Sequence, residues 1–271
     1  MEENAMKGIK LYVLDHGYGG ADPNWFELGS NFALPGDRNA PRGWKVNCFY
    51  SVLIEHPAEG WILIDTGLPA EEEYPGWVLG SMEWHFDEEY SMPAQLAKLG
   101  LKPEDIRHVI LTHMHMDHMG GARYFKDTAT FYVQRREAEA AYTTVMASPD
   151  TLRHGFYFKD TVLTPVKEMV YLDGDIELFP GIELISLPGH TPGCMGAVVS
   201  LESGDVIIAG DAVSLESNYY GMPSGLLTDT AAAAKSIARV HHLERMRKAK
   251  VLFSHDLPRF RELKKAPEHY E

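Results

Sequence analysis

Four short loops with side chains of metal-ligand type constrain this fold most strongly, because each loop follows an apolar, β-prone run. The runs cover residues 108–112, 182–187, 205–210 and 250–254. Five imidazoles and two carboxylates follow them: His113, His115, Asp117, His118, His190, Asp211 and His255. Since an apolar β-prone run predicts a strand, each group lies where a strand should end. We therefore expect one edge of the sheets to bring all seven side chains together.

Seven nitrogen and oxygen ligands exceed the needs of one tetrahedral zinc ion, which takes four, and suit two metal ions that share a bridging carboxylate. The strongest signal is HxHxDH at 113–118. Three imidazoles and a carboxylate so close together repel one another and lose hydration unless a cation is bound. Taken singly, His190, Asp211 and His255 are each compatible with an ordinary loop, turn or cap. Their common position after apolar runs assigns them to the same site.

Charge and cysteine content limit the partners and the compartment. The chain has 39 acidic and 25 basic residues and a formal net charge of −14, so its surface should repel phosphate backbones and we expect no nucleic-acid partner. Cys48 and Cys194 lie far apart, which favours buried thiols in a reducing cytosol. The N-terminus lacks a basic start followed by an apolar stretch, and no long apolar run occurs. We expect a cytoplasmic protein without a membrane partner.

The remaining pattern is typical of an α/β protein with a substantial core. Strands are expected over 9–14, 46–54 and 61–64, the last two as a hairpin. Helices are expected over 91–102, 119–125, 135–146 and 230–246. Strands followed by helices, twice over, predict two sheets packed face to face with helices outside, a four-layered αββα sandwich. We expect this sandwich to form a single domain over residues 1–271.

Residues 69–92 have no regular period but are rich in aromatic side chains, among them Trp77, Trp84 and Phe86. Two interpretations stay open. The segment could be core filler beneath a surface loop, or a flap that supplies an apolar wall to the metal pocket. Met116 alternates with the ligands of the first loop and belongs to the same expected substrate pocket.

The HxHxDH motif and the order and spacing of the three later ligands resemble the metallo-β-lactamase superfamily. DTG at 65–67 resembles the turn that this superfamily carries behind its first metal loop. The similarity runs from about Val46 to Asp256, most of the chain. Within the superfamily, the chain length, the hairpin SVLIEHPAEGWILIDTG and the closing SHD resemble the N-acyl homoserine lactone lactonases, which are quorum-quenching metallohydrolases.

The resemblance implies two divalent metal ions, with zinc as the first choice and iron, cobalt or manganese as alternatives. It implies that one ion is bound by His113, His115 and His190, the other by Asp117, His118 and His255, and that Asp211 bridges both. Two such ions lower the pKa of a shared water toward neutrality and generate the hydroxide that opens a lactone ring. The expected substrate is a small-molecule lactone or ester, and assembly as a homodimer stays open.

One position departs from the lactonases that this chain resembles. They carry a tyrosine three residues after the bridging aspartate, whereas this chain has Ser214 there. A serine hydroxyl is too short to reach where a phenol reaches. We therefore expect Tyr219 or Tyr220 of the same loop to assist the leaving oxygen, or the substrate to be different. With Asp117 and Asp211, these three residues are the catalytic candidates.

Three other classes share parts of the pattern. A thioesterase of the glyoxalase II type has the same metal loop but normally a helical C-terminal domain, whereas only a short tail follows His255 here. An oxygen-reducing di-iron protein would favour a glutamate in place of His115 and a fused flavin domain. A non-catalytic metal-binding protein would tolerate the loss of the bridging carboxylate that Asp211 provides. The sequence therefore favours a lactone hydrolase, with another ester or thioester hydrolase of this fold as the alternative.

Overall fold

The computed structural model describes residues 8–30, 35–36 and 43–271 and contains two β-sheets within them. The first sheet has the strand order β4 (Glu83–Trp84), β1 (Lys10–Ala21), β2 (Lys45–His56), β3 (Gly60–Ile64), β5 (Ile106–Ile110), β6 (Thr130–Gln134) and β7 (Glu168–Leu172). The second has the order β12 (Lys250–Leu252), β11 (Gly204–Ile208), β10 (Met195–Leu201), β9 (Ile182–Ser186) and β8 (Ile176–Phe179). Both sheets are mixed, because β3, β5, β6 and β7 run parallel in the first and β11 and β12 run parallel in the second.

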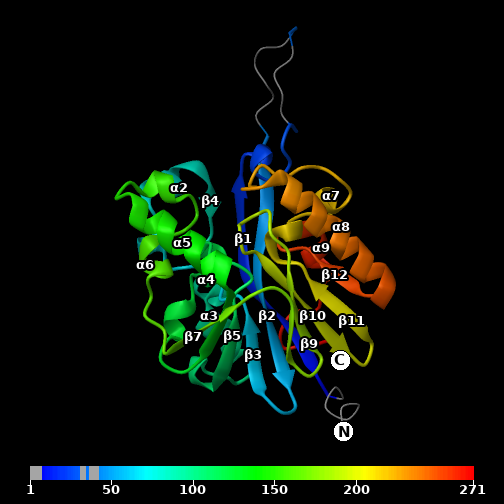
Figure 1. Cartoon of the computed structure of the whole chain (residues 1–271). Coiled ribbons are helices and arrows are strands. Elements are labelled where there is room, and N and C mark those ends of the chain that lie inside the picture. Colours follow the sequence, from blue (N-terminus) through cyan, green and yellow to red (C-terminus); the bar gives the residue numbers. More distant parts are fainter. Residues whose placement is uncertain (1–7, 31–34, 37–42) are drawn as a thin grey trace.

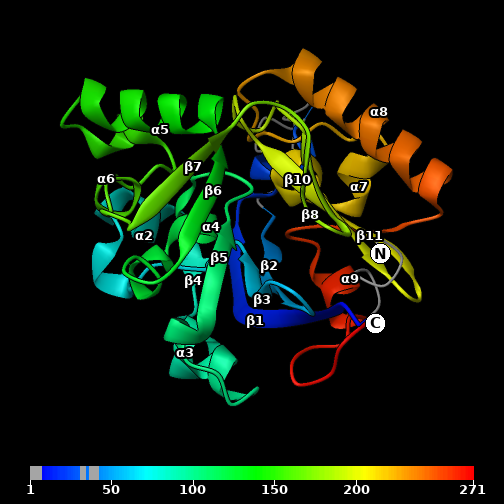
Figure 2. The ribbon, with the colours of Figure 1, turned by 60° about the horizontal axis from the view of Figure 1, so that its bottom comes forward.

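Helices cover the outer faces of both sheets (Figure 1). The helices of the described residues are α2 (Gly76–Ser81), α3 (Met92–Ala97), α4 (Met116–Met119), α5 (Arg135–Ala147), α6 (Lys159–Val162), α7 (Glu216–Tyr219), α8 (Thr230–Arg247) and α9 (Leu257–Arg261). Among them, α3 and α5 pack on the outer side of the first sheet and α8 on that of the second, whereas Phe260 of α9 packs between the sheets. The two longest, α5 and α8, lie on opposite outer sides of the sheets (Figure 2). In the part of the chain that the structure describes, no helix is long and apolar enough to span a membrane.

Alternation along the strands explains the layers. In β2, Val52 and Ile54 pack in the cluster between the sheets with residues of β9 to β12, whereas Leu53 packs outward with residues of α3 and α5. Successive side chains of a strand point to opposite faces, so a strand that is apolar at every position must be covered on both sides. On the far side of the second sheet, Val198 and Ile207 pack against α8. The predicted αββα arrangement is confirmed.

Most of the elements expected from the sequence are present. The hairpin forms as β2 and β3, and Ser91 accepts a hydrogen bond from the Ala94 amide at the start of α3, as a helix N-cap does. This helix ends at Ala97, earlier than expected, and the chain turns at Gly100 with φ of 71°.

The helix expected over 119–125 is wrong. The structure has α4 over Met116–Met119 and a separate 3-10 turn over Ala122–Tyr124. The glycines between them permit a close approach of two backbones, as expected. A Cβ atom at Gly120 would lie 2.1 Å from the Pro69 nitrogen, and one at Gly121 would lie 2.2 Å from the Thr66 carbonyl oxygen. The first metal-type loop is therefore pressed against the turn that follows β3.

Candidate metal centre

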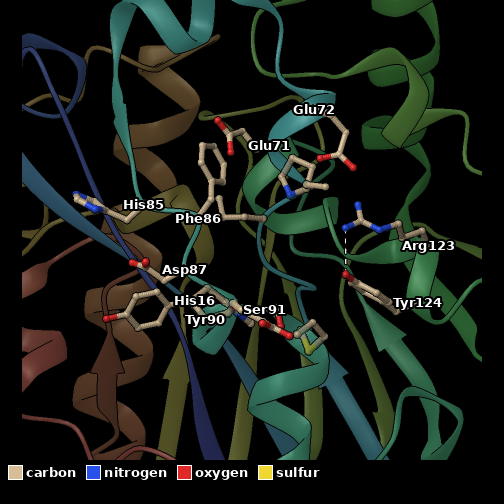
Figure 3. Close-up of a pocket in the computed structure, with 15 residues that line it drawn as sticks. His16, Glu71, Glu72, His85, Phe86, Asp87, Tyr90, Ser91, Arg123 and Tyr124 are labelled. Atoms are coloured by element: carbon tan, nitrogen blue, oxygen red, sulfur yellow. Dashed lines mark hydrogen bonds between the residues drawn. The ribbon is translucent and has the colours of Figure 1, made fainter.

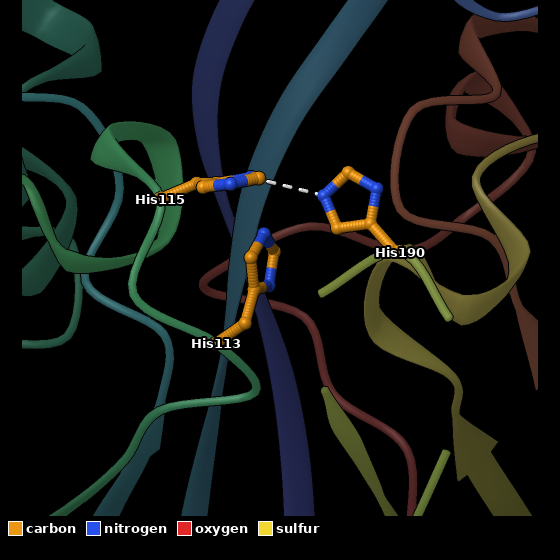
Figure 4. A group of neighbouring side chains, drawn as sticks. All are labelled: His113, His115 and His190. Carbon is orange, nitrogen blue, oxygen red and sulfur yellow. Dashed lines mark hydrogen bonds between the residues drawn. The ribbon is translucent and has the colours of Figure 1, made fainter. Parts of the chain in front are cut away.

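The four loops with metal-type side chains meet at one edge of the two sheets. They follow β5, β9, β11 and β12, and Asp211 lies in a 3-10 turn over Gly210–Val213. Three groups of side chains have ligand atoms within 4.8 Å of one another: His113, His115 and His190; His113, His118 and Asp211; Asp117, His118 and His255. Figure 4 shows the three rings of the first group around a common point. The structure thus brings all seven side chains together.

Asp211 lies between the two sides of the site. Its Oδ2 is 3.3 Å from Nε2 of His190, and its Oδ1 is 3.3 Å from Nε2 of His118. Nε2 of His255 lies 3.2 Å from Asp211 and 3.4 Å from Asp117. One carboxylate therefore has an oxygen on each side, which is the geometry that a ligand shared between two ions needs.

Buried polar atoms without partners test whether a metal fits this site. Nε2 of His113, Nε2 of His118 and Oδ1 of Asp211 are buried and have no hydrogen-bond partner among the described residues. A buried polar atom without a partner costs about 1–3 kcal/mol. A bound cation would compensate these atoms, since neutral imidazole nitrogens and carboxylate oxygens are ligands for divalent metals. The donor set fits two metal ions.

Hydrogen bonds on the far side of three rings fix the orientation of the ligand nitrogens. The Nδ1 groups of His118, His190 and His255 lie 2.8 Å from Asp65, 2.6 Å from the Leu226 carbonyl and 2.9 Å from the Cys48 carbonyl. A carbonyl or carboxylate oxygen can only accept here, so Nδ1 carries the proton in each ring. The lone pair of Nε2 then faces the site, as in most metal-binding histidines.

Asp65 holds the first ligand loop as well as the ring of His118. Its two carboxylate oxygens accept hydrogen bonds from the Thr112 amide at 2.7 Å and the Thr112 hydroxyl at 2.8 Å. Asp65 adopts φ of 61°, a left-handed conformation that costs a non-glycine residue of order 1–3 kcal/mol and is found mainly at functional sites. The sequence identified DTG as a turn but gave no sign of this contact with His118.

Glu137 links the first and second ligand loops, and the sequence gave no signal for it. It lies at the start of α5 but is fully buried. Its carboxylate accepts hydrogen bonds from the Met114 amide at 3.0 Å, the Gly193 amide at 3.1 Å and the Tyr157 hydroxyl at 2.9 Å. The ring of Tyr157 also packs against His115, with centroids 4.6 Å apart. In the sequence, Glu137 looks like any exposed glutamate of a helix.

Burial and charge set the protonation of the ligands. Burial, together with the neighbouring imidazoles, lowers the pKa of His113 and of His115 well below the ordinary histidine value, so both rings are neutral and can offer a lone pair. Burial opposes ionisation of Asp211, but His255, His118 and His190 outweigh it and hold the pKa of this carboxyl well below its usual range. Although burial opposes it, Asp117 and Asp211 raise the pKa of His118 and of His255, so without metal these two rings favour the protonated form. His113, His115 and Asp211 thus have the charge states that a divalent metal needs, whereas His118 and His255 must release a proton when a metal binds.

A narrow cavity of about 30 Å³ lies over these side chains. Its lining combines five of the seven metal-type residues with mostly apolar side chains: Phe26, Asn47, Phe49, Met82, Trp84, His115, Met116, Asp117, Phe156, His190, Asp211, Leu226 and His255. These five metal-type residues therefore face both the metal site and the space above it. Two of the four pocket residues expected from the sequence, Met116 and Trp84, line this cavity.

The other two expected pocket residues lie further away. Trp77 packs in an apolar cluster with Met116 and Phe156, and Phe86 belongs to the same cluster. Phe86 also lines a separate cavity of about 310 Å³ (Figure 3). Sequence reasoning missed Phe26, Asn47, Phe49, Phe156 and Leu226 as lining residues, because none of them belongs to a motif in the sequence, whereas Met82 lies within segment 69–92.

Segment 69–92 is held to the first sheet through β4, which pairs with β1 at Gly19 and Gly20. The ring of Trp84 stacks on Phe49 with centroids 5.5 Å apart. The segment therefore supplies both packing and part of the cavity lining, so features of both interpretations are present. Whether it acts as a substrate flap stays a prediction.

The residues expected to assist the leaving oxygen lie beside a different cavity. Ser214, Tyr219 and Tyr220 line a space of about 500 Å³ together with Asp211 and residues of α8. The Tyr219 hydroxyl donates to Glu244 at 2.5 Å and its ring stacks on His241, whereas the Tyr220 side chain is exposed. Among the described residues, neither tyrosine lines the cavity over the metal site, so their part in the reaction stays a prediction.

Comparisons with known proteins agree with this site. The family model of the metallo-beta-lactamase superfamily matches residues 50–255. An N-acyl homoserine lactonase from a Bacillus species is 33% identical over 218 residues, which cover 78% of this chain and 82% of that protein. N-acyl homoserine lactonase AiiB from Agrobacterium fabrum is 28% identical over 284 residues, covering 97% of this chain and 99% of that one.

A solved structure extends the match to the whole fold. It is an N-acyl homoserine lactone hydrolase with the product N-hexanoyl-L-homoserine bound at its catalytic metal center. It superimposes with a TM-score of 0.82 at 27% identity and covers 98% of this chain and 99% of its own. Fold, ligand clusters and relatives lead to one conclusion: this chain belongs to the metallo-β-lactamase superfamily and is a metal-dependent hydrolase.

Proposed function

We propose that this hydrolase opens the lactone ring of N-acyl homoserine lactones with the help of two zinc ions. The observation that carries the proposal is the position of Asp211, which has one oxygen near His190 and the other near His118. The lactonases that the chain resembles at about 30% identity support the substrate class. The related hydrolase with a bound N-acyl homoserine product supports the placement of the substrate over the ligand clusters.

The ligands divide between two ions in this proposal as the resemblance implies. The first ion takes His113, His115 and His190; the second takes Asp117, His118 and His255; Asp211 is common to both. When bound, two such ions supply a water of low pKa and polarise a carbonyl oxygen. Asp65, Leu226 and Cys48 hold the rings so that the ligand nitrogens stay in place.

Asp117 is the side chain best placed to move a proton in this reaction. It lines the cavity, and its Oδ2 lies 3.4 Å from Nε2 of both His118 and His255. Burial opposes its ionisation, but the two histidines outweigh burial and lower the pKa of its carboxyl. A carboxylate in this position can accept the proton of the attacking water and return it to the ring oxygen as that oxygen leaves.

The apolar lining and Ser214 bear on the substrate. Phe26, Phe49 and Phe156 restrict the cavity and exclude bulk water from the reacting carbonyl. The alkoxide of an opened lactone stays tethered, so a lactone is the ester that best tolerates the absence of a phenol at position 214. Ser214→Tyr restores that phenol three residues after Asp211, and we expect it to raise lactone turnover.

A substrate panel tests the proposal directly. The purified protein, with its metal content measured, is assayed against matched lactones, open-chain esters, thioesters and phosphodiesters. We expect kcat/KM to be highest for the N-acyl homoserine lactones and to vanish in the metal-depleted protein. A thioester or open-chain ester that turns over much faster would replace the lactone assignment with the alternative hydrolase activity.

A further inference from the structure

Asn47 is a buried polar residue with no partner beside the metal centre. Its side chain is 1% exposed, and neither its Oδ1 nor its Nδ2 has a hydrogen-bond partner among the described residues. It lines the narrow cavity together with His115, Asp117, His190 and His255. Because buried amides are nearly always hydrogen-bonded, this one calls for a ligand.

The backbone of β2 fixes Asn47 next to the ligands. Asn47 pairs with Gly19 of β1, and the carbonyl of the following residue, Cys48, accepts the hydrogen bond from Nδ1 of His255. The residue after that, Phe49, packs its ring edge-on against His255 with centroids 5.6 Å apart. The strand that orients a metal-type ring therefore also carries the unpaired amide.

The surroundings of Asn47 limit what can satisfy it. Phe26, Phe49 and Met82 line the same cavity and offer no strong donor or acceptor. The indole Nε1 of Trp84, which also lines the cavity, is itself buried without a partner. One acceptor and two kinds of donor are therefore unsatisfied in one small space. A molecule bound in this cavity can supply both the donor and the acceptor.

The chemistry of an asparagine side chain identifies the class of that molecule. Its NH₂ donates and its carbonyl oxygen accepts, so it matches another amide, whose carbonyl oxygen accepts and whose N–H donates. With a volume of about 30 Å³, the cavity holds a small polar group and not a whole acyl chain. Because His115, Asp117 and His255 line the same cavity, a substrate group beside Asn47 would lie next to the reacting carbonyl.

We propose that Asn47 is a specificity-determining residue that recognises an amide adjacent to the scissile ester bond of the substrate. The proposal rests on the proposed hydrolysis of N-acyl homoserine lactones, which carry such an amide. The side chain binds and orients the substrate. It takes no part in the bond-breaking step, and the metal-type ligands do not depend on it.

Matched pairs of substrates with and without the amide test this role. One pair is an N-acyl homoserine lactone and a γ-lactone of equal chain length in which two methylene groups replace the amide. The second pair is the corresponding open-chain methyl esters. Asn47→Leu removes both hydrogen-bonding groups and keeps a similar volume. We expect kcat/KM to fall about 10- to 100-fold for the amide member of each pair and to stay unchanged for the amide-free member.

Two further variants separate recognition from folding. Met82→Leu changes an apolar lining residue, so we expect it to affect both members of a pair equally. Asn47→Gln keeps an amide, and we expect it to recover part of the preference that Asn47→Leu loses. Metal content and circular dichroism of each variant establish that the fold and the metal site are intact.

A binding measurement on the parent protein needs no variant. Calorimetric titration compares an N-acyl homoserine, the ring-opened product, with the hydroxy acid that lacks the amide. We expect the amide-bearing product to bind at least about 10-fold more tightly, because the amide-free one leaves Asn47 unpaired.

The outcomes distinguish this inference from the proposed function. If Asn47→Leu lowers kcat/KM equally for both members of a pair, or the parent shows no preference for the amide, the inference is wrong. If the parent hydrolyses the open-chain esters and no lactone, the proposed function fails. The pair of esters then still decides whether Asn47 recognises the amide.

Discussion

Asp211 shows how one side chain can be tied to two sides of a metal site, and its replacement gives the first prediction. In Asp211→Ala two nearby cations lose the negative charge between them, so their mutual repulsion rises. We expect metal content and turnover to fall together, as measured by elemental analysis and kcat on the same preparation. Asp211→Asn is the control, because it keeps an oxygen ligand but removes the charge, and it should give a smaller loss of metal. Full turnover in Asp211→Ala would mean that the carboxylate is merely structural.

Asp65 acts one step further from the metals. Its carboxylate accepts a hydrogen bond from Nδ1 of His118, 2.8 Å away. The Asp65→Asn substitution therefore removes the charge that holds this ring. We expect the affinity for the second metal to fall about 10- to 100-fold, the effect typical of partners behind a metal ligand. Competition with a chromophoric chelator measures it. Asp175→Asn, which breaks an exposed pair with Arg239, should leave the affinity unchanged.

Residue chemistry decides which parts of the site the sequence could predict. His113, His115 and the other metal-type residues were found because imidazoles and carboxylates after apolar runs are costly without a cation. Glu137 and Asn47 were not found, since a glutamate in a helix and an asparagine in a strand are ordinary in a sequence. What makes them unusual is burial, which arises from contacts between distant segments such as Glu137 with Gly193.

Whole helices were likewise predictable where a local pattern defines them and not where contacts between distant segments do. Helix α8 was predicted within a residue because its pattern is regular, and the structure shows Asp229 as its cap, accepting hydrogen bonds from the Ala231 and Ala232 amides. The helix expected over 119–125 failed because Gly120 and Gly121 pack against the turn after β3. That contact joins segments some 50 residues apart, as the hydrogen bond between Thr66 and His118 shows, so no local pattern contains it.

Segment 69–92 gives a prediction about substrate length. Trp84 lines the cavity over the metal site, whereas Phe86 lies in the cluster behind it and lines a separate cavity. If this segment walls the acyl chain, Trp84→Ala should raise KM more for long-chain than for short-chain substrates. The difference corresponds to about 1–3 kcal/mol of lost apolar contact. Phe86→Ala, which also shortens an aromatic side chain of the segment, should change KM equally for all chain lengths. Equal effects of chain length in Trp84→Ala would favour the core-filler interpretation.

The side chain of Tyr219 links α7 to α8 through its contacts with Glu244 and His241. A structural role of this residue can therefore be measured separately from a catalytic one. Burial and the hydrogen bond to Glu244 raise the pKa of its hydroxyl, so the phenol stays protonated and donates. We expect Tyr219→Phe to lower the free energy of unfolding by about 1 kcal/mol with little change in kcat. Urea denaturation and steady-state kinetics measure both quantities. Tyr220→Phe, at an exposed position, is the matched control and should be neutral. A fall in kcat at full stability would instead support the expected help to the leaving oxygen.

On the scale of the whole molecule, the metal site joins the two sheets. The loop after β5 comes from the first sheet, and those after β9, β11 and β12 come from the second. Ligands from both sheets converge on Asp211, and the shared apolar cluster lies between the same sheets. Metal binding should therefore stabilise the whole fold and not one loop, because the ions hold together segments that are far apart in the sequence.

The last prediction concerns metal content and stability together. Seven ligands exceed the needs of one ion, so protein purified without chelator should contain about two metals per chain by elemental analysis. A ligand that binds only the folded chain stabilises it, by about 4 kcal/mol at a concentration 1,000 times its dissociation constant. Removal of the metal by a chelator should therefore lower the melting temperature, and titration with zinc should restore it in two steps or with a stoichiometry of two. Cobalt, manganese and iron added in parallel rank the metals by the stability and turnover that each restores. A firm stoichiometry of one metal or none, with an unchanged melting temperature after chelation, would contradict the dinuclear site, because the buried nitrogens of His113 and His118 would then be tolerated without a cation.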